Sequence, residues 1–501
     1  MINFFTRNKK VEPIKKIGMR QHRKIFVDRK VEEYTKQLQT RSLGLVGDRI
    51  DSATERNVIV GSINSAIKGS AHRLYNQGRT LALNTSIGSR YTQHVIDQVV
   101  GTGLMPKTFI LKGGKLDVET NTNIENVFWR WAGSQKRFSR NGKVNFLECL
   151  KMMEKERLMG GDAFLVLHEE GKDLQVSVFG ADAVDWADCR KLDSGNVVYQ
   201  GIEYDTETLR PVAYWFRRRD LLTQSYNGER YRVSAEYVLH YYIPSTAEAL
   251  RGVTDFLPVI KDIAHMDAFR ETAIIQKRVA ASSMGFIERP KDEGGDFDTG
   301  EDQIYPETDV VTDFEPGTIQ ELPAGATIKT MQASQGGDDF EKFNEAMLTA
   351  ISMGLSSYKT ALTGDTSNVN YSAARFGSLM ERNRFKGHQD RLIDTVVMPL
   401  FEAFLNHAVL HSRINIRMTQ IESVLVSTTV IRPKYESVDP IKDINAEVML
   451  IEKGLKSKSS VIMERGEDPV QVFKEIEAEK STLNTSVASD AENKPAETQE
   501  E

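Results

Sequence analysis

The sequence predicts an α+β fold, because strand-like segments are grouped in one part of the chain and long helical patterns in another. Short apolar runs of strand length, bounded by turn residues, recur between residues 163 and 243. Helical patterns extend over residues 258–281, 338–353 and 371–410. Of the 501 residues, 40% are apolar and 27% are charged, which is typical of a soluble protein with several substructures.

The first 50 residues form a basic arm. Residues 1–30 hold ten Lys or Arg against Glu12 and Asp28. Such an arm is either a solvated tail or an electrostatic contact to an acidic partner, and the sequence leaves both open. The segment has no apolar core of a secretion signal, and no apolar run reaches the length of a membrane span. Two cysteines, Cys149 and Cys189, are too few for a disulfide framework, so we expect a reducing compartment.

Residues 51–255 are expected to form an α+β domain. Gly160 and Gly161 should end one helix before a buried strand, and further strands are expected up to residue 243. Gly101 and Gly103 should end an earlier helix; no preceding strand or third glycine supports a nucleotide site there. His240 reads as a half-buried residue with a hydrogen-bond partner.

A helix with a narrow, interrupted apolar stripe is predicted at residues 256–283, and a small acidic β-rich module at residues 284–335. The stripe suits packing against copies of the same helix better than burial in a core. The acidic run DEGGDFDTGED invites comparison with a calcium loop, but it lacks the EF-hand order of ligands, so a solvated loop is favoured.

A second helix is predicted at residues 336–356, where Asp338 and Glu341 have the spacing of a capping box and Gly354 is a natural stop. Residues 357–371 are rich in Thr, Ser, Asn and Gly, which indicates an exposed loop. A long helix should follow at residues 372–412, basic in its first half, apolar in its second, and kinked or broken at Pro399. Helical patterns continue through residues 413–480, and residues 481–501 are expected to be disordered.

Motifs of known catalytic chemistry are missing from the sequence, including Walker A, GxSxG and HExxH, which argues against an enzyme and against a bound cofactor. His407 and His411 lie one helical turn apart, but a third metal ligand is not evident. A metal-dependent DNA-processing enzyme remains an alternative, in which Asp162, Asp182 and Asp185 would hold Mg²⁺. Otherwise these carboxylates keep strand edges soluble.

The segment LTGDTSNVNYSAAR at residues 362–375, followed by a long Arg-containing helix, resembles the signature of lambda-family portal proteins of tailed phages. Ala373 stands where a second Ser is common in that family. SQKRFSRNGKVNFLECL, GGDAFLV, LRGVTDFLPVI and the C-terminal VDPIKDINAE are similar to other blocks of the family. The resemblance implies a portal fold with wing, stem, clip and crown-like C-terminal regions, assembled as a ring that is usually twelve-fold.

By the same resemblance, residues 51–255 and the long helix at 372–412 are wing, residues 256–283 and 336–356 are stem helices, and residues 284–335 are the clip. The expected tunnel loop in the DNA channel includes Thr363, Gly364, Asp365, Thr366, Ser367, Asn368, Val369, Asn370 and Tyr371. Contacts to a neighbouring subunit or to DNA are expected from Arg375, Arg382, Arg384, Lys277 and Arg278. The expected docking surface of the clip holds Asp296, Asp298, Glu301, Asp302, Glu307 and Asp309.

The implied partners are further copies of the chain, double-stranded DNA, the major capsid protein, the terminase large subunit and later a head–tail adaptor, without a membrane. The implied location is the portal vertex of the virion, after assembly in the host cytoplasm. A structural adaptor or scaffold without a DNA channel is the alternative of a different class. A closed ring with a lumen wide enough for duplex DNA would distinguish the two.

Overall fold

The computed structural model describes most of the chain and divides it into two compact units. The described residues are 62–169, 172–220, 222–281, 285–288, 327–330, 337–365, 370–435 and 440–492. Unit 1 comprises Met1–Thr80, Ile96–Thr254 and Gly387–Glu501, and unit 2 comprises Leu81–Val95 and Asp255–Lys386. The helices α2 (Ile63–Asn84), α3 (Ser86–Val99) and α10 (Tyr371–Leu392) contribute residues to both units.

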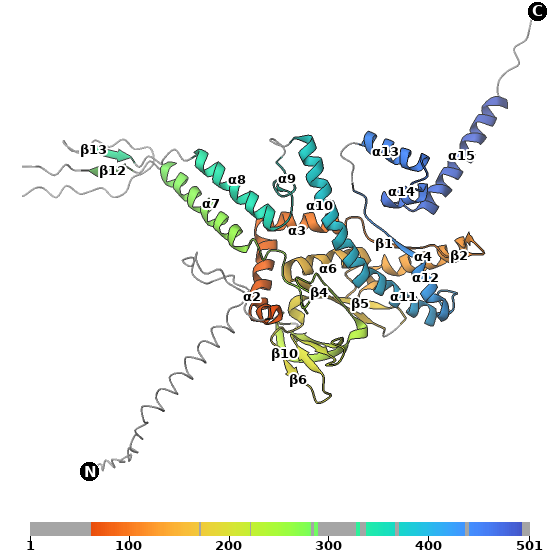
Figure 1. Cartoon of the computed structure of the whole chain (residues 1–501), viewed down its shortest axis with the longest axis horizontal. Coiled ribbons are helices and arrows are strands. Elements are labelled where there is room, and N and C mark those ends of the chain that lie inside the picture. Colours follow the sequence, from red (N-terminus) through yellow and green to blue (C-terminus); the bar gives the residue numbers. More distant parts are fainter. Residues whose placement is uncertain are drawn as a thin grey trace, which may run out of the picture. The chain divides into compact units, whose positions relative to one another are not determined.

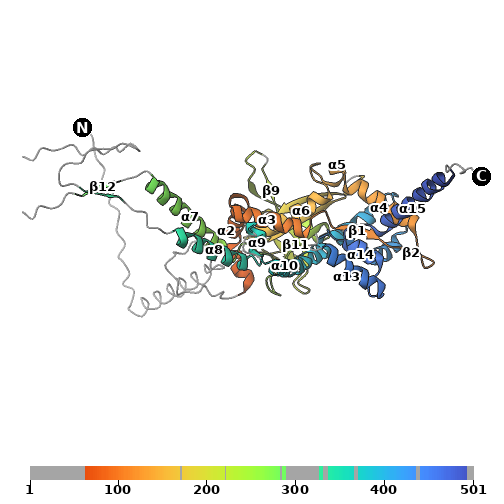
Figure 2. The same ribbon diagram turned by 90° about the horizontal axis from the view of Figure 1, so that it is seen from above.

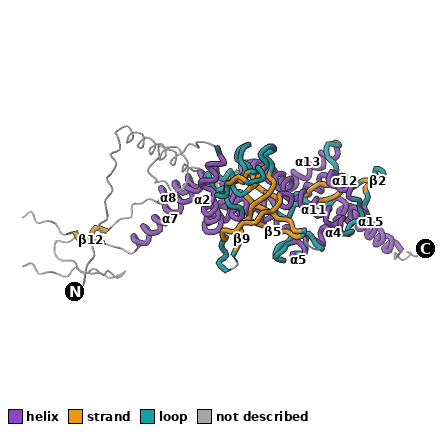
Figure 3. The backbone as a smooth tube through the Cα atoms, turned by 90° about the horizontal axis from the view of Figure 1, so that it is seen from below, coloured by secondary structure: helices purple, strands orange, loops and turns teal. Residues whose placement is uncertain are grey.

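Unit 1 contains the strands that the sequence predicted, and these confirm its α+β character (Figure 3). A three-stranded antiparallel sheet has the order β11-β4-β5, and a five-stranded antiparallel sheet has the order β10-β9-β8-β7-β6. Their bounds are β4 Asp162–His168, β5 Gln175–Gly180, β6 Arg190–Lys191, β7 Val197–Tyr199, β8 Ile202–Tyr204, β9 Pro211–Arg219, β10 Tyr226–Ser234 and β11 Val238–Tyr242. The sequence did not predict β10, whose YNGERYRVS pattern is mostly polar.

The two sheets share one hydrophobic core. Phe164 and Val166 of the first sheet pack with Tyr214 and Phe216 of the second, and all four side chains are buried. The register of the first sheet pairs His240 with Phe164, so the histidine ring stacks on the phenylalanine at 4.5 Å between ring centroids. The predicted half-buried, hydrogen-bonded His240 is therefore confirmed, with its Nε2 3.2 Å from Asp162.

A second core is made by aromatic residues from three helices. α4 (Val118–Ala132), α6 (Phe146–Gly160) and α11 (Met398–Leu410) all contribute, together with the short α5 (Gln135–Phe138). α6 begins with a capping box between Asn145 and Glu148, and Gly161, at φ 91°, turns the chain from α6 into β4. The buried rings are Phe128, Trp131, Phe138, Phe146, Phe401 and Phe404. This core ties the C-terminal half of the long helix to unit 1.

The C-terminal residues belong to unit 1, whereas the sequence suggested a separate helical region. The strand β14 (Thr428–Ile431) pairs antiparallel with β1 (Met105–Thr108), and Lys107 of β1 bridges Glu125 and Asp468 at 2.5 Å each. The remaining elements there are α12 Ile421–Val426, α13 Pro440–Glu452, α14 Lys458–Glu464 and α15 Pro469–Glu492. A small hairpin of β2 (Leu111–Lys112) and β3 (Lys115–Leu116) lies between β1 and α4 in the sequence.

The prediction of a disordered tail at residues 481–501 is wrong for its first part. α15 continues to Glu492, so at least residues 481–492 are helical, and residues 493–501 lie outside the described part of the chain. The segment lacks apolar residues for a core, but it also has no Gly or Pro between Pro469 and Pro495. We attribute the helical conformation of this segment to the helix propensity of its residues and not to burial of an apolar face.

Unit 2 is built around a helical hairpin of α7 (Ile260–Ala281) and α8 (Gly337–Gly354), which lie side by side in two views of the structure (Figures 1 and 2). The apolar patterns at residues 258–281 and 338–353 lie within two residues of the observed helix ends. α8 begins at Gly337, so Asp338 lies inside its first turn. Asp338 is therefore not the N-cap residue that the predicted capping box requires. Gly354 is the last residue of α8, as its role as a stop predicted.

The long helix continues through Pro399 and is not broken there. α10 is followed by a π-helical turn at Ile393–Val397 and then by α11. The wider π-turn absorbs the proline, which cannot donate the hydrogen bond of a regular helix. By length and composition, the continuous helix Arg375–Leu410 could cross a membrane, which differs from the sequence expectation. Half of its most apolar window is buried inside the structure.

Candidate functional site

The predicted tunnel loop is shorter than expected, because a short helix occupies its first part. α9 (Lys359–Thr363) places Leu362 in a buried position, and this apolar anchor was hidden among polar residues in the sequence. Gly364 ends α9 in the left-handed conformation, at φ 72°, and its N–H donates to the Thr360 carbonyl at 2.8 Å. A residue with positive φ is most easily glycine, so Gly364 fixes where the loop leaves the helix.

The far end of the loop is defined by Asn370, whose side-chain oxygen accepts a hydrogen bond from the Ser372 N–H at 3.3 Å. This local bond marks the start of α10, as Asn commonly does at helix starts. On the near side, the Asp365 N–H donates to the Thr363 hydroxyl at 3.2 Å. Residues 366–369, which include Thr366, Ser367, Asn368 and Val369, lie outside the described residues.

The base of the loop is attached to α10 by an aromatic contact. The Tyr358 hydroxyl donates to the Ala373 carbonyl at 3.2 Å, and its ring lies over Gly377. A Cβ atom at residue 377 would stand 2.4 Å from the ring, so only glycine permits this approach.

A carboxylate one turn further along α10 holds the same segment. Glu381 accepts hydrogen bonds from the Ser357 hydroxyl at 2.6 Å and the Tyr358 N–H at 3.3 Å, and His94 Nε2 lies 3.1 Å away. Burial alone would raise the pKa of Glu381, but the hydrogen bonds from His94 and Ser357 outweigh it and lower the pKa. The carboxylate is therefore charged at neutral pH and connects α3, the α8–α9 turn and α10.

Arg384 on α10 also holds this segment, through contacts of its side chain. Its guanidinium donates to the carbonyls of Leu355 and Ser356, at 2.7 and 2.9 Å, and to the Tyr91 hydroxyl at 3.0 Å. These bonds cap the C-terminal end of α8, where carbonyls have no helical partner. Arg384 therefore helps to position the loop base inside unit 2, and the contact to DNA or to another subunit that the resemblance implied for it stays a prediction.

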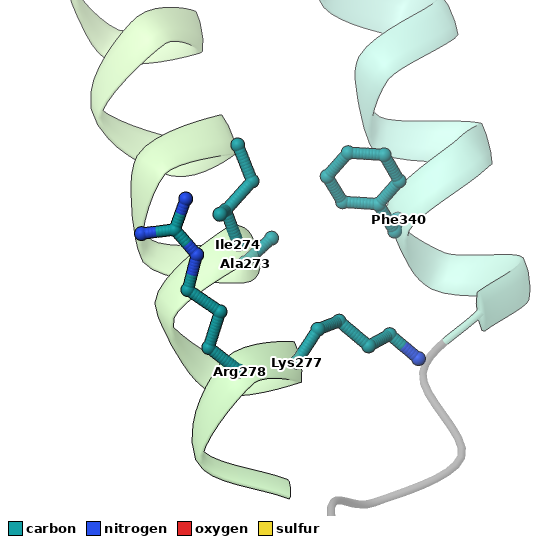
Figure 4. A pocket seen from close by; sticks show the side chains of 5 residues that line it. All are labelled: Ala273, Ile274, Lys277, Arg278 and Phe340. Carbon is teal, nitrogen blue, oxygen red and sulfur yellow. The ribbon is translucent and has the colours of Figure 1, made fainter. Parts of the chain in front are cut away.

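The other predicted contact residues are more exposed. Arg375 and Arg382 are partly exposed on α10, and Lys277 and Arg278 are exposed near the end of α7. Figure 4 shows Phe340 projecting from α8 toward Ile274 of α7, with Lys277 extending across from α7. These side chains, with Ala273 and Arg278, line a surface pocket of about 380 Å³ in unit 2.

The predicted docking residues of the clip, from Asp296 to Asp309, lie outside the described residues. The described remainder of this module is a two-stranded antiparallel ladder between β12 (Gly285–Glu288) and β13 (Thr327–Thr330). It pairs Gly285 with Thr330 and Glu288 with Thr327. The ladder agrees with the β character expected for the ends of this module.

Two of the three carboxylates of the alternative metal site, Asp162 and Asp185, bind arginines. Asp162 is fully buried and bonded to Arg251 at 2.6 Å, which corrects the expectation of a solvated strand edge. Burial alone would raise the pKa of Asp162, but Arg251 and His240 outweigh it and lower the pKa. Asp185 accepts from Arg230 at 2.7 Å. Within the described residues, no three His, Cys, Asp or Glu side chains are grouped as metal ligands.

Sequence reasoning missed the residues that hold the loop base. Gly377, Glu381 and Arg384 follow one another at spacings of four and three residues, so they share a face of α10. That spacing was a signal in the sequence. The sequence analysis did not use this spacing, because the basic residues of the segment were interpreted as contacts to DNA or to another subunit. The buried Arg251 gave no comparable signal, because a fully buried arginine is rare.

Comparison with known proteins decides the family. A family model described as "Phage portal protein, lambda family" matches residues 51–389, which is well over half of the chain. The chain belongs to the lambda family of phage portal proteins. The match takes in the α7–α8 hairpin, the predicted loop and most of α10, and it ends before the π-helical turn.

Two curated relatives carry the same description. The "Probable portal protein" of Halomonas phage phiHAP-1 is 23% identical over 435 residues, covering 83% of this chain and 81% of that protein. The "Portal protein" of Escherichia phage N15 is 20% identical over 257 residues, covering 47% of this chain and 48% of that protein.

Solved structures similar to this portal-family chain come from gene transfer agent particles. A chain in the virion of the native particle has 13% identity and a TM-score of 0.44, with 80% of this chain and 94% of that chain covered. A chain in the neck of the native particle has 14% identity and a TM-score of 0.42, with coverage of 79% and 94%. Because these structural likenesses are low, the family assignment rests on the sequence match.

Proposed function

We propose that the chain forms a homo-oligomeric ring at one capsid vertex, through which double-stranded DNA is packaged and later ejected. The ring is a conduit, and a separate ATP-driven terminase supplies the force. Membership of a portal family supports this proposal. The observation that carries it is the apolar surface that unit 2 leaves exposed.

The hairpin α7–α8 exposes large apolar side chains on more than one face. Ile274 and Ile275 are 52% and 51% exposed, and neighbouring residues of a helix point in directions about 100° apart. α7 also turns Phe269 toward α8, where it contacts Phe343 at 4.2 Å between ring centroids. One partner helix therefore cannot cover the apolar surface of α7.

Further large apolar side chains of unit 2 are exposed on α8 and α10. Met353 at the end of α8 is 70% exposed, and Phe376, Leu379 and Met380 on α10 are 66%, 49% and 59% exposed. Soluble monomers rarely leave so many large apolar side chains uncovered on neighbouring helices. Surfaces of this kind usually mark contacts with other protein chains.

Apolar surface on more than one face suits a contact in which one face of a subunit meets a different face of the next. Such head-to-tail interfaces close into rings when the rotation between subunits divides the circle evenly. Stem helices packed side by side with their copies would cover Ile274 on one side and Ile275 on the other. This explains why α7 keeps apolar residues exposed beyond its first half, in which Ile260, Ile263 and Met266 are buried.

The residues of the predicted tunnel loop suit transient contact with passing DNA. Thr363, Thr366, Ser367 and Asn368 have small, neutral polar side chains, and Asp365 is the only charged residue of the loop. A loop of Lys or Arg would release counterions from the phosphates and hold the duplex tightly, which would stall transport. The proposal assigns residues 363–371 to the channel constriction, on the fixed base formed by α9 and α10.

The remaining partners follow from the same proposal. The acidic module at residues 284–335 would dock the terminase during packaging and a head–tail adaptor afterwards, with its carboxylates steering basic partner surfaces. Unit 1 would face the major capsid protein. Assembly would take place in the host cytoplasm before the ring enters the virion. The role proposed is structural and involves no catalysis.

Assembly can be tested with one charged substitution and a matched control. Ile274→Asp places a carboxylate in the proposed subunit interface, so we expect it to abolish or strongly reduce ring formation. Leu222→Asp changes a residue that is 94% exposed in unit 1 and should leave assembly unchanged. Mass photometry of the purified full-length chain measures the oligomer distribution. Equal assembly of both variants would contradict the proposed interface.

A further inference from the structure

A turn in unit 1 carries a group of positively charged side chains that are not part of the proposed tunnel loop. Between Glu125 and Glu148 the sequence has no acidic residue. The end of α4, the short α5 and the loop that leads to α6 carry five exposed cations instead. These residues, named here the cationic turn, are Arg130, Lys136, Arg137, Arg140 and Lys143.

The two carboxylates that flank the cationic turn in the sequence, Glu125 and Glu148, have other partners. Glu148 accepts the Asn145 N–H at 2.9 Å in the capping box of α6, and Gln135 lies 3.1 Å from the same carboxylate. Glu125 is bonded to Lys107. Among the residues that the structure describes, neither carboxylate forms an ion pair with a cation of the turn.

Four of the five cations make no ion pair with any carboxylate in the described part of the chain. These four are Arg130, Lys136, Arg137 and Lys143. The fifth, Arg140, donates to His168, with 2.8 Å between the Arg140 Nη1 and His168 Nδ1 atoms. The whole chain has a net charge of −6, so this local excess does not follow from its composition.

The backbone of the cationic turn is fixed. Phe138 is fully buried against Trp131, with ring centroids 4.9 Å apart. The Ser139 hydroxyl accepts the N–H groups of Lys143 and Val144 at 3.1 Å each, and the Arg140 N–H donates to the Val176 carbonyl at 3.0 Å. The cations therefore extend from a preorganised surface, which lowers the entropic cost of binding a partner.

The chemistry of the surface favours a phosphate polymer over a protein partner. The cores of protein–protein interfaces are depleted of lysine and need apolar anchors. Between residues 118 and 145 the large exposed apolar side chains are Val118 and Trp129, at 41% and 38%. Protein–DNA interfaces, in contrast, are polar and strongly positive.

We propose that the cationic turn binds the phosphate backbone of duplex DNA without sequence preference. The turn lies in unit 1, whereas the proposed tunnel loop lies in unit 2, so this is a second DNA contact in a different part of the chain. The Lys and Arg side chains contact phosphates and displace their counterions. The inference does not depend on ring formation.

The test measures the salt dependence of DNA binding by the full-length chain, with fluorescence anisotropy of a fluorescein-labelled, mixed-sequence duplex. Arg137→Ala/Lys143→Ala removes two cations of the turn, and Lys112→Ala/Lys115→Ala removes two exposed cations of the β2–β3 hairpin as a control. The slope of log K against log salt should become shallower by about 0.9 for each phosphate that the first variant no longer neutralises. The control should keep the slope of the unsubstituted chain.

Two outcomes overturn the inference. Equal slopes for both double variants would show that general charge, and not this surface, sets DNA affinity. Binding of poly-L-glutamate but not of duplex DNA, abolished in the Arg137→Ala/Lys143→Ala variant, would assign the surface to an acidic protein. Circular dichroism of both variants confirms that they are folded. Neither outcome bears on ring assembly, which is measured separately.

Discussion

Replacing Arg251 tests how strongly a buried ion pair holds unit 1 together. Its guanidinium is completely buried and donates to Asp162 at 2.6 Å, to the carbonyls of Ala181 and Val184 at 2.8 Å each, and to that of Gln200 at 3.3 Å. The residue directly precedes Gly252, in the segment that leads from unit 1 to the helix α7. Arg251→Leu keeps apolar volume at this position and removes every donor.

The cost of this substitution follows from the charge that it leaves behind. Asp162 is also fully buried and would keep hydrogen bonds only from the Gly252 N–H, at 2.7 Å, and from His240. Breaking a buried ion pair from one side typically costs about 3–5 kcal/mol, because the remaining charge is uncompensated. The folding equilibrium constant should therefore fall by about two to three and a half orders of magnitude.

Urea unfolding followed by far-ultraviolet circular dichroism measures this destabilisation. The double variant Arg251→Leu/Asp162→Asn should regain part of the stability, because it contains no buried charge at this position. The deficit of Arg251→Leu should also shrink as the pH falls, since Asp162 can then take a proton; in the unsubstituted chain its lowered pKa keeps it charged. If the double variant is no more stable than Arg251→Leu, the uncompensated charge is not the cause.

Two further predictions concern unit 1 and the loop base. Burial and the nearby Asp182 raise the pKa of Glu156, so charging it destabilises the fold as the pH rises. Glu156→Gln should therefore unfold at a higher temperature than the unsubstituted chain at pH 7.5, and calorimetry should show that this gain shrinks toward pH 4. Gly377→Ala should displace the Tyr358 ring and speed amide hydrogen exchange of the loop base, with ring assembly intact. Gly387→Ala on the same helix meets nothing within 4 Å and should leave exchange unchanged.

Local patterns in the sequence predicted the helices α7 and α8 well. Apolar spacing and the stop at Gly354 placed α8 within two residues, because both are properties of the helix itself. The strand β4 was predicted from its apolar run and its Gly-Gly start for the same reason. The helix α9 was missed because it is only five residues long and lies in a segment rich in Thr, Ser, Asn and Gly, and only the burial of Leu362 reveals its role.

Features that depend on pairing across long sequence distances were not predictable. Arg251 meets Asp162 from 89 positions away in the sequence, and neither residue type indicates full burial. Arg384 faces inward because the carbonyls at the end of α8 lie beside it, which helical periodicity alone does not indicate. The sequence predicted disorder from residue 481, but α15 continues to Glu492. A composition poor in apolar residues indicates that a segment cannot form a core, but it does not indicate that the segment is not helical.

The ring is the central claim, and electron microscopy of the purified full-length chain tests it most directly. We expect class averages to show closed rings with a central lumen wide enough for B-form duplex. The Ile274→Asp variant imaged under the same conditions should give dispersed subunits. Closed rings whose lumen is too narrow for a duplex, or a chain that stays monomeric in the presence of its capsid protein, would contradict the proposed DNA conduit.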